Sequence, residues 1–222
     1  MKKFILALPL LAASTFAQNV LAASDYPTNG IYQEMAGTAN NGEISIDLYN
    51  STNYRSTVRV GMFGGEIIYS PDVLVDPILG NTAPMMGFKY PINKNMAAYG
   101  MLNFDSAADT DLLFGFSYSG GNRDFLYNGN AEIIAPGAAG AENTVRVKGG
   151  AYYAISSRGV GRMYLAGEIV IDTNADTTDL YAAMRFSPKK NVNVDIGVYE
   201  SIDAANVSTT GVPIFFRLTL GI

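Results

Sequence analysis

One acidic stretch of the sequence has the spacing of a metal-binding loop. Asp172, Asn174 and Asp176 alternate with other residues, as the first oxygen ligands of an EF-hand calcium loop do. That loop also needs glycine at its sixth position and a bidentate glutamate at its twelfth, and here these positions hold Thr177 and Ala183. The stretch therefore predicts a solvated acidic loop with at most a loose attraction for divalent ions. No metal site and no cofactor are expected.

Histidine and cysteine are both absent from the chain. Their absence excludes Ser-His and Cys-His nucleophilic pairs, histidine general bases and the usual zinc sites. It also excludes disulfides and lipid-modified cysteines. A catalytic role would need a pair of carboxylates or an unfamiliar nucleophile, so an enzyme is not expected.

The charged residues of interest lie within stretches that alternate between apolar and polar side chains. In 192–200, Val192, Val194 and Ile196 share one face, while Asn193 and Asp195 share the other. Period-2 alternation is typical of a β-strand with two unlike faces. Seven charged side chains lie on such polar faces away from the expected turns: Arg59, Arg146, Lys148, Glu168, Arg185, Asp195 and Arg217. These seven are the candidate functional residues.

Alternating stretches of this kind make up most of the chain. Five strong ones follow one another near residues 144–155, 162–171, 178–187, 192–200 and 212–222. Weaker candidates lie near residues 28–37, 43–49, 57–69, 84–90, 96–104, 111–119 and 124–134. Successive strands joined by turns indicate an antiparallel meander. The prediction is an all-β, up-and-down barrel of about twelve strands, with ten possible if the weakest candidates are dropped.

The expected connections alternate between short and long. Tight turns are expected at 90–95, 157–161 and 188–191, and longer segments at 71–84, 134–143, 172–177 and 201–211. Short turns at one end and longer loops at the other are typical of transmembrane β-barrels. A soluble sandwich has no reason to sort its loops in this way. The alternative that remains is a soluble barrel, in which the polar face would simply be hydrated.

The N-terminus has the features of a secretory signal peptide. Lys2 and Lys3 precede an apolar stretch from 4 to 13 that is too short to span a membrane, and Val20-Leu21-Ala22 fits the small-residue cleavage rule. We expect residues 1–22 to be cleaved and residues 23–222 to form one barrel domain. The formal net charge is −5, and loss of the two lysines makes it −7. Nucleic acid is a poor partner for such a chain.

The last eleven residues, VPIFFRLTLGI, resemble the C-terminal strand of a Gram-negative outer-membrane β-barrel protein. In that class, alternating apolar residues run to a terminal aromatic that the barrel-assembly machinery recognises, and here the chain ends in Ile222. The resemblance implies an outer-membrane location, with lipid and lipopolysaccharide around the apolar face. Val192, Val194 and Ile196 would then face lipid, and the seven charged residues would line the lumen.

Two functions are compatible with this fold. The leading prediction is a small porin-like channel that passes small solutes passively, because twelve strands lie between the eight that leave a filled interior and the sixteen that leave a wide channel. The alternative is a closed barrel whose lumen is filled by ion pairs and whose loops are the functional part. Pairing about the turn at 188–191 puts Arg185 opposite Asn193, with Arg217 approaching Asp195 from the next strand. The oligomeric state and the solute are not predicted.

Overall fold

A computed structural model describes residues 34–50, 54–70, 84–104, 110–138, 140–156, 161–173, 177–189, 192–203 and 214–222. The signal peptide predicted for residues 1–22 lies outside the described residues. No helix in the described part of the chain is long and apolar enough to cross a membrane.

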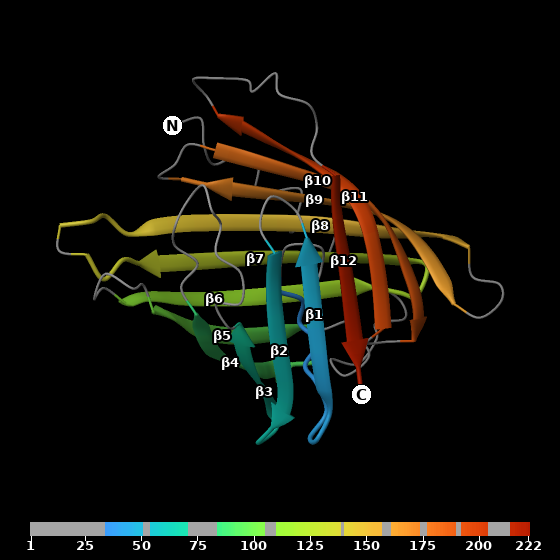
Figure 1. Ribbon diagram of the computed structural model, residues 1–222, viewed down its shortest axis with the longest axis horizontal. Helices are drawn as coiled ribbons and strands as arrows, with labels where there is room; N and C mark the ends of the chain where they lie inside the picture. The colour runs from blue at the N-terminus through green and yellow to red at the C-terminus, as the bar shows by residue number, and fades with distance from the viewer. Residues whose placement is uncertain are drawn as a thin grey trace.

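The described residues form one closed antiparallel β-barrel of twelve strands (Figure 1). The first six are β1 (Ile44–Asn50), β2 (Tyr54–Met62), β3 (Gly65–Ser70), β4 (Met85–Asn93), β5 (Met96–Phe104) and β6 (Thr110–Gly121). The others are β7 (Phe125–Ala135), β8 (Thr144–Ser156), β9 (Arg162–Asp172), β10 (Thr177–Lys189), β11 (Val192–Asp203) and β12 (Ile214–Gly221). Each strand pairs with its neighbours in sequence, and β1 pairs with β12 to close the sheet. The all-β fold, the up-and-down order and the count of about twelve are therefore confirmed.

The connections between strands are sorted by length, as the sequence predicts. The three longest, 71–84, 136–143 and 204–213, all lie at the same end of the barrel because each follows an odd-numbered strand. At the opposite end, β2 and β3 are joined by 63–64, β4 and β5 by 94–95, and β10 and β11 by 190–191. The three longest connections therefore share one end of the barrel, although the connection 51–53 at that end is short and 157–161 at the opposite end has five residues.

Two strand predictions were wrong, and their errors cancel in the count. The stretch 57–69 is two strands, because Phe63 and Gly64 have φ of 56° and 76° and reverse the chain between β2 and β3. Two successive positive φ values match the twist of a hairpin, but the usual asparagine or aspartate is missing, so the turn has a weak sequence signal. The predicted strand at 28–37 is absent from its described part, which forms only an isolated bridge at Glu34.

The two faces of the sheet differ as the alternation predicts. Along β11, Asn193 and Asp195 are buried inside the barrel, whereas 57% of Ile196 is exposed on the outside. The last strand shows the same pattern, with Phe215 and Arg217 inside and Ile214 and Phe216 outside. Polar groups thus concentrate inside and apolar groups outside, which is the reverse of a soluble barrel.

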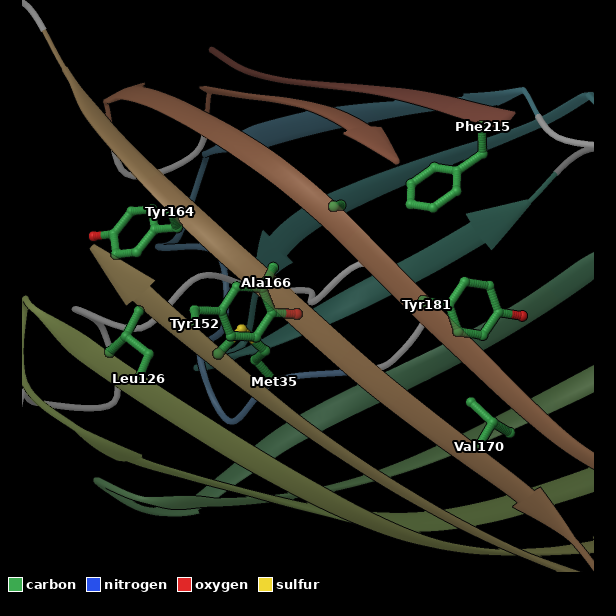
Figure 2. Packing of buried hydrophobic residues seen from close by; sticks show 9 residues of the cluster. Met35, Leu126, Tyr152, Tyr164, Ala166, Val170, Tyr181 and Phe215 are labelled. Carbon is green, nitrogen blue, oxygen red and sulfur yellow. The ribbon is translucent and has the colours of Figure 1, made fainter. Parts of the chain in front are cut away.

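The interior also contains apolar side chains among its charged ones. A cluster of buried apolar residues lies along β7 to β10 and β12: Leu126, Tyr152, Tyr164, Ala166, Val170, Tyr181, Ala183 and Phe215. Met35, which precedes the first strand, belongs to the same cluster, and Figure 2 shows it beside Tyr152. A segment from before β1 therefore lies within the barrel.

Candidate functional site: the barrel lumen

Residues 34–40, which we call the lumen segment, lie next to strands β2 to β7, with 34–39 buried in the interior and Asn40 exposed. Side chains of the barrel wall form hydrogen bonds with the backbone of the segment. The Ala36 N–H donates to Ser119 Oγ at 2.8 Å and the Ala39 N–H donates to Glu66 Oε2 at 2.8 Å. Asn130 Nδ2 donates to the Glu34 carbonyl at 2.9 Å, and Ser117 Oγ donates to the Met35 carbonyl at 3.3 Å. These contacts satisfy buried backbone groups that no sheet partner satisfies.

The Glu34 side chain anchors the segment to two basic residues of the wall. Arg59 donates to both of its oxygens, at 2.6 and 2.9 Å, and Lys89 Nζ donates to Oε2 at 2.9 Å. Burial alone would raise the pKa of this carboxyl, but Arg59 and Lys89 outweigh that effect and hold its pKa well below the usual range. Glu34 is therefore ionised at neutral pH.

Arg59 and Lys89 also have carboxylate partners in the wall. Arg59 contacts Asp47 Oδ2 at 3.1 Å and Glu66 Oε1 at 2.7 Å, and Lys89 contacts Glu66 Oε1 at 3.3 Å. The four side chains come from β1, β2, β3 and β4 and are all buried. This network crosses four neighbouring strands, and opposite charges on neighbouring strands help to define their register.

A second ion pair joins β10 and β11. Arg185 Nε donates to Asp195 Oδ1 at 2.7 Å and Nη2 donates to Oδ2 at 2.9 Å, a two-pronged contact. The Arg185 guanidinium also lies 5.1 Å from the centre of the Tyr152 ring. The predicted register was wrong here, because Arg185 is directly opposite Asp195 and not Asn193. The chain turns after Lys189, which pairs with Val192, nearer the C-terminus than predicted, and one extra residue on β10 between Phe186 and Lys189 offsets the pairing by one position.

Arg217 lies opposite Asp195 in the pairing of β12 with β11, as predicted, yet its guanidinium contacts Asp47 Oδ2 of β1 at 3.3 Å. Asp47 therefore receives contacts from Arg59 on one side and from Arg217 on the other. It also accepts a hydrogen bond of 2.5 Å from Thr219. This carboxylate therefore links Arg217 of β12 to the β1–β4 network across the closure of the barrel.

The remaining charged residues form a third group near β7 and β8. Lys148 Nζ contacts Glu132 Oε1 at 2.7 Å, and the Tyr99 hydroxyl donates to the same oxygen at 2.6 Å. Arg146 contacts Asp172 at 3.0 Å and is only partly buried. Glu168 accepts a hydrogen bond from the Tyr152 hydroxyl. No cluster suited to a metal ion occurs among these or the other described residues.

The structure places all seven candidate residues on the inner face of the barrel, and it distributes them among separate groups. Arg59, Lys148, Glu168, Arg185, Asp195 and Arg217 are buried, and Arg146 is partly buried near the end of its strand. Whether they line a path for solutes stays a prediction. Five further charged residues of the lumen were not identified from the sequence: Glu34, Asp47, Glu66, Lys89 and Glu132. Asp47 and Glu132 lie on the polar faces of alternating stretches, and this alternation is the sequence signal that could have identified them as inward-facing residues.

The charges of the wall balance one another. Its buried acids are Asp47, Glu66, Glu132, Glu168 and Asp195, and its buried bases are Arg59, Lys89, Lys148, Arg185 and Arg217. Five acids face five bases, and Glu34 of the lumen segment adds one negative charge. The described wall therefore carries no net buried charge of its own.

Solved structures provide a match to this architecture. The structure of "KdgM porin in complex with disordered oligogalacturonate" superposes with a TM-score of 0.53 at 7% sequence identity, covering 81% of this chain and 97% of that one. This chain has the fold of the KdgM porin. A second structure, "KdgM porin", gives a TM-score of 0.51 at 7% identity with the same coverage. A NanC porin structure gives 0.46 at 10% identity over 80% of this chain and 97% of that one.

Comparisons of the sequence give no further assignment. No family model matches the chain, and no curated protein matches it. At 7% identity the likeness to KdgM establishes the barrel architecture, and the lumen residues have to be interpreted from their own contacts.

Proposed function

We propose that this protein is a passive channel for small solutes in the outer membrane of a Gram-negative bacterium. The observation that carries the proposal is a closed twelve-stranded barrel with a charged inner face and an apolar outer face, the architecture that it shares with the KdgM porin. Passage through such a barrel requires no catalytic step. The balanced wall favours small neutral or zwitterionic solutes over strongly charged ones.

The surroundings of the barrel follow from its outer face. Exposed Ile, Leu, Val and Phe side chains such as Ile196 and Phe216 suit contact with outer-membrane lipid and lipopolysaccharide. The alternating C-terminal strand β12 suits recognition by the barrel-assembly machinery during insertion. A cleaved signal peptide at residues 1–22 would direct the export that this location requires.

A second candidate function is favoured by the packing of the lumen. The segment 34–40 and the ion pairs fill much of the interior, and the wall residues Glu66, Lys89 and Asp195 have no exposed surface. A barrel that stays filled would act through its longer loops, as a structural or surface-interaction protein. The two candidates differ in whether the refolded protein ever conducts ions.

Single-channel recordings on protein refolded into planar lipid bilayers test the proposal. Arg185→Ala combined with Arg217→Ala should shift the selectivity of a conducting lumen toward cations, because Asp195, Glu168 and Asp47 then dominate the local field. In a permanently filled barrel, the same double substitution should create a leak and lower the thermal stability.

The matched control for this experiment is Lys94→Ala, which removes a positive charge from an exposed turn outside the lumen. It should change neither selectivity nor stability. If the double variant behaves like this control in selectivity, conductance and stability, the assignment of Arg185 and Arg217 to a common lumen would have to be abandoned.

A further inference from the structure

The lumen segment is bound to the barrel as a ligand is, and the sheet closes without it. Its described residues contribute no strand to the barrel, since β1 pairs with β12 and with β2. The wall recognises it through six side chains on β2 to β7: Arg59, Glu66, Lys89, Ser117, Ser119 and Asn130. They bind the backbone of the segment and its one carboxylate, and together they define a peptide-binding site.

The wall keeps its charges paired if the segment leaves. Arg59 retains Asp47 at 3.1 Å and Glu66 at 2.7 Å, and Lys89 retains Glu66 at 3.3 Å. Removing one partner of a buried pair is costly when it leaves a charge uncompensated, and here neither base is left in that state. Departure of Glu34 therefore leaves a wall with equal numbers of buried acids and bases.

A turn at a glycine connects the segment to β1. Gly42 has φ of 83°, in the region that favours glycine, at the turn between the segment and β1. On the inner face of β2, Gly61 leaves room for the segment: a Cβ atom there would lie 1.8 Å from the Asn40 carbonyl oxygen and 2.8 Å from that of Ala39. The segment can pass this point only because residue 61 has no side chain.

We propose that residues 34–40 are a displaceable plug, held in a peptide-binding site of the lumen by Glu34 and released to open the channel. This inference rests on the proposed function, because a plug regulates passage only if the barrel conducts. The ligand of the site is an acidic peptide, and its resident example is the chain's own Glu34-Met35-Ala36. Solute passage then depends on the balance between the bound and the released segment.

The first measurement reports release directly and does not depend on conduction. The chain has no cysteine, so Ala36→Cys introduces a single thiol at a position that is 0% exposed. A water-soluble maleimide should label it slowly in the refolded full-length protein. Adding Gly61→Val, whose side chain overlaps the segment, should raise the labelling rate by about tenfold or more, the change that roughly 1.4 kcal/mol produces.

The matched control is Gly167→Val, at an outward position where the nearest atom to an added Cβ is 3.8 Å away. It introduces the same side chain into a strand without touching the segment, so labelling should not change. Heat-modifiable gel migration checks that each variant is folded. Unchanged labelling of a folded Gly61→Val variant would overturn the proposal, because the segment would then stay bound despite a side chain at position 61.

The second measurement is conductance of the same variants in planar bilayers. Gly61→Val should increase the open probability by about tenfold over the parent, in proportion to segment release. Glu34→Gln, which keeps the shape of the side chain but removes its charge, should act in the same direction. Its control, Glu142→Gln, makes the same change at an exposed residue of the connection between β7 and β8, and it should have little effect.

The outcomes separate the two proposals. If the parent conducts as well as Gly61→Val while labelling shows release, the barrel is a channel but the segment does not regulate it, and the plug is disproved alone. If release is seen and no variant conducts, both the plug and the channel function fail. Faster labelling together with higher open probability supports both.

Discussion

Removing the negative charge of Asp195 should be among the most destabilising single changes in this barrel. Asp195 is 0% and Arg185 2% exposed, and the two form hydrogen bonds of 2.7 and 2.9 Å. Asp195→Asn keeps the size of the side chain and leaves the guanidinium in place without its partner. Removal of one member of a buried pair costs about 3–5 kcal/mol of folding free energy. The Tyr152 ring beside Arg185 contributes roughly 0.5–2 kcal/mol, which is too little to compensate.

The free energy of unfolding can be measured by urea titration of the protein refolded in lipid vesicles. Because the chain has no tryptophan, circular dichroism and heat-modifiable gel migration are suitable probes of the folded fraction. The matched control is Asp124→Asn, the same chemical change at an exposed turn, which should stay within about 0.5 kcal/mol of the parent.

A double-mutant cycle distinguishes the pair from its separate members. Arg185→Met combined with Asp195→Asn removes both charges, and replacing a whole buried pair is often close to neutral. The double variant should therefore lose at least about 1 kcal/mol less than the sum of the single losses. The reasoning would be refuted if Asp195→Asn were as mild as Asp124→Asn, or if the two single losses simply added.

Three further predictions concern the outer face, a glycine contact and pH. Ile196→Arg should cost about 2–4 kcal/mol of unfolding free energy if residue 196 lies at the bilayer midplane. Its control, Ile92→Arg near a strand end, should cost about 0–1 kcal/mol. If Ile196→Arg loses no stability in the urea titration, this face does not meet lipid. Gly115→Val should cost about 1–3 kcal/mol of unfolding free energy by overpacking, since an added Cβ would lie 2.4 Å from the Tyr99 ring. Gly167→Val should cost far less. Equal thermal midpoints for the two variants would contradict the contact between Gly115 and Tyr99. Glu34 faces Arg59, Glu66 and Lys89, and its pKa is lowered. Its contribution to the binding of the lumen segment should therefore be fully present above the usual glutamate pKa of about 4.3 and be lost at lower pH, as the Glu34 carboxylate becomes protonated. After correction for thiolate reactivity, the labelling rate of the Ala36→Cys variant should therefore be the same at about pH 7 and pH 5.5. A large rise in labelling over that range would show that an ionised Glu34 does not hold the segment.

The faces of the strands could be predicted from the sequence because side-chain alternation is a local property. Asn193, Asp195 and Ile196 are assigned to inside and outside by their order in one extended strand, whatever that strand pairs with. The same local rule identified the inner-face position of Arg59, Lys148 and Arg217. Loop lengths are also local, so the end of the barrel with the longer connections could be recognised.

Pairing partners could not be predicted in the same way, because they depend on irregularities that alternation does not reveal. The hairpin between β10 and β11 turns after Lys189, which pairs with Val192, and the irregularity between Phe186 and Lys189 then offsets the pairing by one residue, so Arg185 meets Asp195. The turn at Phe63-Gly64 likewise divides one apparent strand into β2 and β3 and brings Glu66 beside Arg59. A register shift changes which charges meet while leaving the pattern of each strand almost unchanged.

The sequence by itself determined that the chain folds as a barrel with a charged interior, since period-2 alternation, turn residues and loop lengths all act over short distances. Only the tertiary structure decided what fills that interior. Residues 34–40 have the composition of a weak strand, but their backbone is satisfied by Ser119, Glu66 and Asn130, which lie 27 to 96 positions away in the chain. Such partners become neighbours only when β1 and β12 close the sheet, so the occupancy of the lumen is a property of the closed barrel and not of any segment alone.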